Sequence, residues 1–312
     1  MQGAETIAFR SVSPATYRGL LAGSVKATDD ICGYLTMPRM GVDRPPLVVI
    51  SIGSQGFKAG REELYSRALN DIGIAAFVVD SFTPRGFAET TSGQGRLSMA
   101  AGTSDALHAI RHMRDDPRID ARRIGMLGFS RGGHAVVAAH HRGLQEAVLG
   151  RSDAVAAHIA LYPALNPRWR HPLPTSAPML LLYGEADELV PASKSRACAE
   201  EVAAAGGDVT LIGYAGAHHG FDSLGPAAAT SSVNLSRCNT FIESDGEIVE
   251  ETTAIRTGND WAGFLDQLQK ALGTVGATVG HGTAGREIAV KTVQGFLRQT
   301  LFGGARRAAV NE

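Results

Sequence analysis

A continuous apolar run, Ile124–Phe129, leads into the sequence Gly128-Phe129-Ser130-Arg131-Gly132, and helix-forming residues follow as far as His140. A strand that turns directly into a helix holds the residue at the turn in a strained backbone conformation. Glycines are needed on both sides because a Cβ there would collide with a neighbouring strand or helix. The strain points the Ser130 hydroxyl out at the carboxyl edge of a sheet, where open α/β sheets bind ligands. This feature predicts a parallel sheet that presents a serine.

Short strand-like runs alternate with helical stretches along most of the chain, which is typical of a mainly parallel sheet with helices on both faces. Leu47–Ile52 is apolar without alternation and therefore predicts a strand buried on both faces. Further strands are expected at Thr6–Phe9 and Ile31–Met37 (an early antiparallel pair), Ile74–Asp80, Val155–Leu161, Met179–Tyr183 and Val209–Tyr214, and helices at Glu62–Asp71, Met99–Arg114, Ser193–Ala205 and Arg286–Leu301. The Pro-rich stretch 163–178 predicts a loop.

Residues 222–282 break this alternation. Asp-Gly within Glu243–Ile248 predicts a hairpin with a two-residue turn, and Trp261–Leu272 predicts a helix. The last helix carries its apolar residues on one face and is expected to pack back on the main sheet. We therefore predict a single domain, residues 1–312, with a hairpin-plus-helix insertion at 222–282 that forms a wall or lid of the site.

The charge balance excludes several function classes. Thirty Lys and Arg face 31 Asp and Glu, which argues against nucleic acid or an anionic membrane surface as a partner. No apolar run is long enough to span a membrane, and the first residues lack the apolar core of a secretory signal. We expect a cytoplasmic protein, or a secreted or periplasmic one if a signal was removed. The sequence leaves the oligomeric state open, with a homo-oligomer as one option. Free thiols are the default for the cysteines, with a Cys198–Cys238 bridge left open.

A serine hydroxyl is a poor nucleophile and needs a base to accept its proton. In a strand–turn–helix serine hydrolase the partners follow in the order serine, acid, histidine. Asp187 lies just past one apolar strand and His219 just past the next, so both are expected at the same sheet edge as Ser130. We favour Asp187 over Glu185 and Glu188 because its shorter side chain is more firmly placed, and His219 over His218 because Gly220 lets the loop turn.

The negative oxygen of a tetrahedral intermediate needs hydrogen-bond donors. One is expected to be the backbone N–H of Arg131, at the start of the helix after the serine. The other is expected in the loop Gly53–Gly56, with the N–H of Ser54 favoured and that of Gln55 as the alternative. No cofactor and no metal are predicted.

These motifs resemble the dienelactone hydrolase family of the α/β-hydrolase fold, in its serine-using members. The matching pieces are Asp80–Gly86, Arg123–Gly133, Tyr183–Pro191 and Ala217–Asp222, and the HGF sequence of the last piece supports His219. The resemblance implies hydrolysis of a carboxylic ester of a small molecule.

The chain departs from the pattern of authentic dienelactone hydrolases in three features. Those enzymes use a cysteine where this chain has Ser130, place a glutamate near the nucleophile where it has Gly53, and hold the substrate carboxylate with an arginine pair. Arg85 stands where one of those arginines is expected, and the second is missing after His219. Dienelactone itself is therefore a doubtful substrate. Arg85 is a candidate substrate contact whose alternative is a structural ion pair, and Trp169 either lines the pocket or fills the loop.

Two other patterns carry less chemistry. Gly280–Gly285 spells G-x-G-x-x-G, but no strand–helix–strand unit surrounds it, so dinucleotide binding is not expected. His108 and His112 lie four apart on a predicted helix, without the glutamate of a zinc protease motif. Two rivals to an esterase stay open, a peptidase or amidase on the same fold and a non-catalytic ligand-binding protein.

Overall fold

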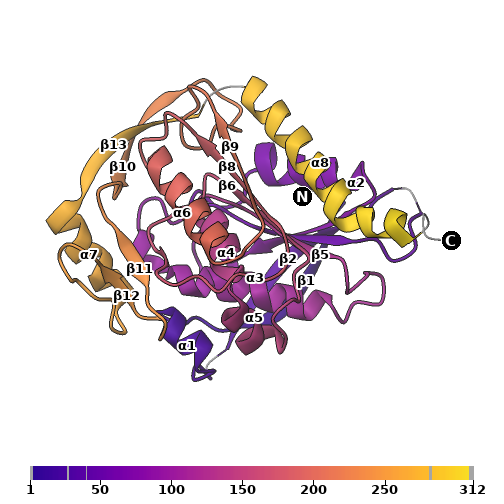
Figure 1. Ribbon diagram of the computed structural model, residues 1–312, viewed down its shortest axis with the longest axis horizontal. Helices are drawn as coiled ribbons and strands as arrows, with labels where there is room; N and C mark the ends of the chain where they lie inside the picture. The colour runs from indigo at the N-terminus through magenta and orange to yellow at the C-terminus, as the bar shows by residue number, and fades with distance from the viewer. Residues whose placement is uncertain (1–2, 27, 40, 281–282, 309–312) are drawn as a thin grey trace.

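The computed structural model describes residues 3–26, 28–39, 41–280 and 283–308. Within these ranges an eight-stranded sheet runs in the order β1-β2-β4-β3-β5-β6-β8-β9 (Figure 1). β1 and β2 pair antiparallel, as do β2 and β4, and the other neighbours are parallel. The strands are β1 (Glu5–Ser11), β2 (Asp29–Thr36), β3 (Leu47–Ser51), β4 (Ala75–Asp80), β5 (Ile124–Phe129), β6 (Ala157–Leu161), β8 (Met179–Gly184) and β9 (Val209–Tyr214). The predicted α/β fold, with its early antiparallel pair, is confirmed.

Helices cover both faces of this sheet. On one face α2 (Leu64–Asn70) and α8 (Thr283–Ala308) lie side by side (Figure 1). α8 contributes Ala289, Val293 and Leu297 to the core. The other face carries α1 (Tyr17–Leu21), α3 (Met99–Met113), α4 (Arg131–Ala139), α5 (Arg142–Leu149) and α6 (Ala192–Ala204). Burial on both faces explains why β3, β4, β5 and β6 are apolar without alternation. The last helix returns to the sheet as its apolar face predicts.

Residues 222–280, which we name the inserted layer, form a layer of their own at one side of the molecule (Figure 1). β10 (Ala228–Asn234) and β13 (Thr274–Val279) pair as an antiparallel ribbon. β11 (Thr240–Ile242) and β12 (Ile248–Glu250) form a hairpin, and β7 (Arg168–Trp169) joins its open edge in parallel. α7 (Trp261–Leu272) follows. The predicted hairpin and helix are present.

The turn of the hairpin is longer than the Asp-Gly pair predicts. Ile242 pairs with Ile248, so five residues make the connection and the two-residue prediction is wrong. Gly246 has a positive φ of 85° and its carbonyl accepts a hydrogen bond from Arg18 N at 3.2 Å. A Cβ on Gly246 would lie 2.2 Å from that nitrogen. The turn is therefore shaped by its contact with α1, which is distant in sequence.

Other differences are local. The Pro-rich stretch contains β7 and is not wholly a loop, because its backbone pairs with β11. The helix expected from Glu62 begins instead with a π-helical turn, η1 (Ala59–Glu63), before α2. Cys198 and Cys238 are both buried and free, so they form no bridge.

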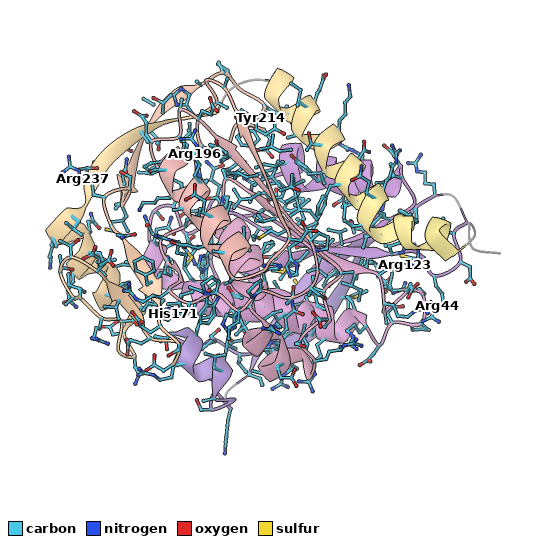
Figure 2. All side chains as sticks on the ribbon, viewed as in Figure 1. Arg44, Arg123, His171, Arg196, Tyr214 and Arg237 are labelled. Atoms are coloured by element: carbon cyan, nitrogen blue, oxygen red, sulfur yellow. The ribbon has the colours of Figure 1, made fainter. Side chains whose placement is uncertain are left out.

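Side chains fill the space between sheet and helices, while charged residues such as Arg44, Arg123 and Arg237 lie at the periphery (Figure 2). None of the helices in the described ranges has the length and apolarity that crossing a bilayer requires.

Candidate active site

Ser130 occupies a strained turn between β5 and α4. Its φ and ψ are 53° and −111°, a conformation that costs a non-glycine residue on the order of 1–3 kcal/mol. Backbone hydrogen bonds hold it there: Ser130 N donates to Leu161 O at 3.0 Å, and Ser130 O accepts from His134 N at 2.9 Å. The glycines on either side are sterically required. A Cβ on Gly128 would lie 2.1 Å from Gly132 O, and one on Gly132 would lie 2.0 Å from Ser51 O.

Asp187 and His219 follow β8 and β9, which are adjacent strands, and their loops are held together by backbone contacts. Ala186 N donates to Ala217 O at 2.9 Å. Gly184, at the end of β8, allows this close approach, because a Cβ there would lie 2.3 Å from Ala217 O. The chain order serine, acid, histidine thus brings three loops to one edge of the sheet.

The three side chains form a continuous hydrogen-bonded array. His219 Nε2 lies 2.8 Å from Ser130 Oγ, and His219 Nδ1 lies 2.8 Å from Asp187 Oδ2. The other Asp187 oxygen accepts hydrogen bonds from the backbone N–H groups of Leu189 and Val190, each at 2.8 Å. The side chain of Asp187 is 1% exposed and that of His219 is 12% exposed. A fixed carboxylate therefore orients a ring that remains accessible beside the serine.

The alternatives within these loops point elsewhere. Glu188 accepts a hydrogen bond from the backbone N–H of Thr278, in β13. Among the described residues, His218 Nδ1 is buried without a hydrogen-bond partner. It is the ring of His219 that contacts both Ser130 and Asp187.

A cavity of about 400 Å³ opens at this array. Ser130, His219 and two of the three predicted oxyanion residues, Ser54 and Gln55, line it, whereas Arg131 is not among its lining residues. Among the hydrogen bonds of the described residues, the backbone N–H groups of Ser54 and Gln55 have no acceptor, so both remain available to a ligand. The inserted layer supplies much of one wall. Besides Asp222, its lining residues are Ser223, Leu224, Thr230, Ser232, Val233, Val279 and Gly280.

Four further lining residues, Arg61, Gln94, Tyr162 and Asp222, escaped the sequence analysis. The Tyr162 ring packs edge-on against the His219 ring at 5.0 Å, and its hydroxyl donates to Asp222 at 2.6 Å. Burial raises the pKa values of Tyr162 and Asp222. Tyr162 directly follows the end of β6, and Asp222 directly follows the HGF sequence. These two positions are the sequence signal that could have identified them as site residues. Arg61 and Gln94 lie in helical turns, and no sequence pattern there indicates a site residue.

The dienelactone hydrolase family profile matches residues 33–243, two thirds of the chain. The chain belongs to the dienelactone hydrolase family. The resemblance read from the motifs is confirmed, and the expectation of a carboxylic ester hydrolase is confirmed at the level of the family. No curated protein is similar enough in sequence to count as a relative.

Solved structures of similar fold include two of esterase 2 from Thermogutta terrifontis. The form phosphoramylated by tabun is 23% identical with a TM-score of 0.53, and 72% of this chain covers 88% of that one. The form phosphorylated by paraoxon is 24% identical with a TM-score of 0.52, and 72% of this chain covers 87% of that one. A Klebsiella pneumoniae protein assigned as a dienelactone hydrolase is 19% identical with a TM-score of 0.51, and the match covers 70% of this chain and 89% of that one. These likenesses show the shared α/β-hydrolase fold.

Arg61 occupies the space beside Gly53, where the family pattern suggested a glutamate side chain. A Cβ on Gly53 would lie 3.4 Å from an Arg61 nitrogen. The guanidinium pairs with the fully buried Glu62 at 2.5 Å and lies over the Phe129 ring, 4.8 Å from its centroid. Burial raises the pKa of Glu62, although the Arg61 charge opposes that shift. The residue preceding Ser130 thus packs against a buried ion pair.

Arg85 does not reach the cavity, so the candidate substrate contact is wrong. Its guanidinium pairs with Asp105 at 2.8 Å and with Asp29 at 3.1 Å. Asp105 is fully buried and needs that partner. Arg85 is structural, the alternative kept open by the sequence.

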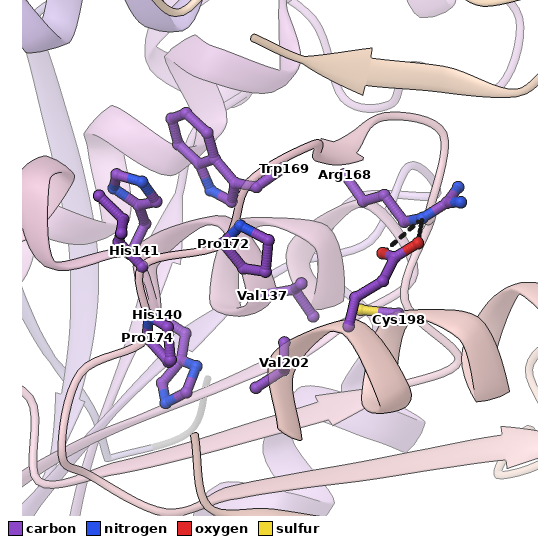
Figure 3. Close-up of a pocket in the computed structure, with 11 residues that line it drawn as sticks. Val137, His140, His141, Arg168, Trp169, Pro172, Pro174, Cys198 and Val202 are labelled. Atoms are coloured by element: carbon purple, nitrogen blue, oxygen red, sulfur yellow. Dashed lines mark hydrogen bonds and ion pairs between the residues drawn. The ribbon is translucent and has the colours of Figure 1, made fainter. Parts of the chain in front are cut away.

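Trp169 also lies away from Ser130. It lines a separate cavity of about 20 Å³, where Arg168 pairs with Glu201 (Figure 3). Its ring stacks on His141 at 3.9 Å and its Nε1–H donates to Ala138 O at 3.2 Å. The bulky ring fills the space between α4 and the Pro-rich stretch, so the substrate-contact prediction is wrong.

The two remaining patterns have structural roles in the described residues. Gly280 follows β13 and donates its N–H to His219 O at 2.7 Å, whereas His281 and Gly282 lie outside the described residues. His108 Nδ1 contacts Ser104 O at 2.9 Å within α3, and His112 stacks near Phe9.

Proposed function

We propose that the protein hydrolyses carboxylic esters of small molecules by a two-step acyl transfer with Ser130 as the nucleophile. The observation that carries the proposal is the pair of 2.8 Å contacts linking Ser130 Oγ, His219 and Asp187, with Ser130 and His219 lining a cavity of about 400 Å³. A serine, a base within hydrogen-bond reach and an acid that orients the base are what acyl transfer requires.

In the first step His219 Nε2 accepts the Ser130 proton while Oγ attacks the acyl carbon. Asp187 keeps the proton of the neutral ring on Nδ1, so that Nε2 is free to act as base, and it stabilises the imidazolium that forms. The two backbone N–H groups on the second oxygen of Asp187 fix this orientation.

The tetrahedral oxyanion is stabilised by backbone N–H groups. The Arg131 amide lies at the start of α4, where the helix dipole favours negative charge. The second donor is the Ser54 amide, with Gln55 as its neighbour, and the absence of another acceptor for either N–H in the described residues supports this role. His219 then protonates the leaving alcohol, and water repeats the sequence to release the acid.

A fluorophosphonate probe tests the proposal because only an activated serine reacts with it. We expect labelling of the wild-type protein, loss of labelling in Ser130→Ala, and hydrolysis of p-nitrophenyl acyl esters at rates far above those of aminoacyl anilides. Faster anilide cleavage would favour a peptidase. A folded wild-type protein that neither labels nor hydrolyses esters would be a non-catalytic binding protein.

The inserted layer is proposed to select the acyl or alcohol part of the ester. Leu224, which is 61% exposed, and Val233 bring apolar surface to the cavity from this layer. Replacing both by aspartate should lower kcat/KM more for long-chain than for short-chain p-nitrophenyl esters. An equal change along the series would contradict this role.

A further inference from the structure

Residues 88–98, which we name the bridging segment, cross from one proposed oxyanion donor to the other. At its first end the segment holds the Ser54 loop. Thr90 N donates to Ser54 O at 2.7 Å. The backbones are so close that a Cβ on Gly56 would lie 2.0 Å from Ala88 O. The loop therefore cannot shift without moving this segment.

At its other end the bridging segment holds the side chain of Arg131, the residue after the nucleophile. Its guanidinium donates to Leu97 O at 2.9 Å and to the backbone and side-chain oxygens of Gln94 at 3.1 and 2.8 Å. Arg131 is 4% exposed, and within the described ranges no carboxylate pairs with it. Burial lowers its pKa to about 10, so it stays charged at neutral pH. A buried charge without a counter-ion depends on such carbonyl contacts.

Gln94 joins the two ends. Its side-chain oxygen accepts from Arg131, and its Nε2–H donates to Ser54 Oγ at 3.1 Å. The same residue lines the cavity beside Ser130. One amide side chain thus contacts both residues whose backbone N–H groups we propose as oxyanion donors.

The inserted layer supports Gln94 from behind. Trp261, at the start of α7, donates its Nε1–H to Gln94 O at 3.0 Å. The packing is tight, because a Cβ on Gly95 would lie 3.1 Å from Ala262 Cβ. α7 therefore limits how far the bridging segment can move.

We propose that Gln94 is a positioning residue, which fixes the separation of the Arg131 and Ser54 amides, and that α7 holds it in place. This inference rests on the proposed function. An oxyanion hole acts only if its donors lie 2.7–3.1 Å from the developing charge, and loss of one donor costs about 10²–10³ in kcat. Because Gln94 positions the donors without being one, its removal should cost less, about 10- to 100-fold.

Gln94→Leu tests the proposal, since it keeps the size of the side chain and removes both contacts. We expect kcat for a p-nitrophenyl ester to fall about 10- to 100-fold with little change in KM. Gln267→Leu is the matched control, because Gln267 lies on the exposed face of α7, and it should keep wild-type kcat. Trp261→Phe removes the N–H while keeping an aromatic ring, and it should give a smaller fall of the same kind.

Gln94→Glu is the conservative variant. A carboxylate still accepts from Arg131, and the Ser54 hydroxyl can turn to donate to it. We expect kcat within a few-fold of wild type. A Gln94→Glu protein that is folded, by thermal unfolding, yet as slow as Gln94→Leu would overturn the positioning role.

A transition-state analogue separates positioning from general disruption. The inhibition constant of an alkyl trifluoromethyl ketone, whose adduct carries the oxyanion, should rise in proportion to the loss of kcat/KM in Gln94→Leu. The matching secondary alcohol forms no oxyanion, and its inhibition constant should stay within twofold. Unchanged ketone affinity, or an equal rise for both inhibitors, refutes the inference. A wild-type protein without ester hydrolysis refutes the proposed function itself, so the two failures are distinguishable.

Discussion

Asp187→Asn should nearly abolish hydrolysis while leaving the fold intact. One oxygen of Asp187 accepts two backbone N–H groups, from Leu189 and Val190, and the other faces His219 Nδ1. In the asparagine variant the side-chain oxygen must keep facing the two backbone donors. The opposite orientation would leave both donors unpaired against an NH₂ group, at about 1–3 kcal/mol each. The new NH₂ group therefore faces His219.

An NH₂ group donates to Nδ1 and so forces the ring proton onto Nε2. The Nε2–H then points at Ser130 Oγ, 2.8 Å away, and cannot accept its proton. An orientation preference of about 2–6 kcal/mol corresponds to about 30- to 20,000-fold depletion of the competent tautomer. The same substitution in a serine protease triad lowers kcat about 10⁴-fold, within that range. We expect a loss of about 10³- to 10⁴-fold here.

The assay is kcat for a p-nitrophenyl ester together with the melting temperature. Because both backbone hydrogen bonds persist, the melting temperature should change by no more than a few degrees. Asp266→Asn, which removes an exposed carboxylate paired with Lys270 on α7, is the matched control and should retain wild-type kcat. An Asp187→Asn protein that keeps more than a tenth of wild-type kcat would refute the assignment of Asp187 as the orienting acid.

Three further predictions concern stability and the placement of the serine. Arg85→Met should destabilise the protein by about 3–5 kcal/mol in urea unfolding, because it leaves Asp105 buried without its partner. The KM of the folded fraction should stay unchanged. A selective rise in KM for anionic esters would instead restore Arg85 as a substrate contact. Gly132→Ala should abolish fluorophosphonate labelling, because the new Cβ would lie 2.0 Å from Ser51 O and must displace α4; full labelling would contradict this. Burial lowers the pKa of His134 from 6.5 to about 4, so the unfolded state binds a proton first as pH falls. Through this residue the unfolding free energy should therefore drop by about 3 kcal/mol between pH 6.5 and 4. His134→Gln should flatten that pH dependence, and an unchanged slope would contradict it.

The sequence by itself determined the fold class and predicted the Ser130–Asp187–His219 array. The reason is that these features depend on local chain geometry. An apolar strand, a glycine-flanked serine and a following helix are contiguous, and the loops after adjacent parallel strands must meet at one edge of the sheet. The contacts of Ser130 with His219 follow from that edge rather than from details of packing.

The tertiary structure alone decided which side chains surround the array. Arg85 follows the end of β4, and Trp169 lies in the stretch that the sequence predicts as a loop, as substrate contacts often do. In the structure, however, Arg85 pairs with Asp105 and Trp169 stacks on His141. Gln94 reaches the site because a helix far along the chain, which begins at Trp261, packs against it. Such pairings join residues that are distant in sequence, and they are set by which buried charges and polar groups need partners once the chain is folded. No local pattern encodes that requirement.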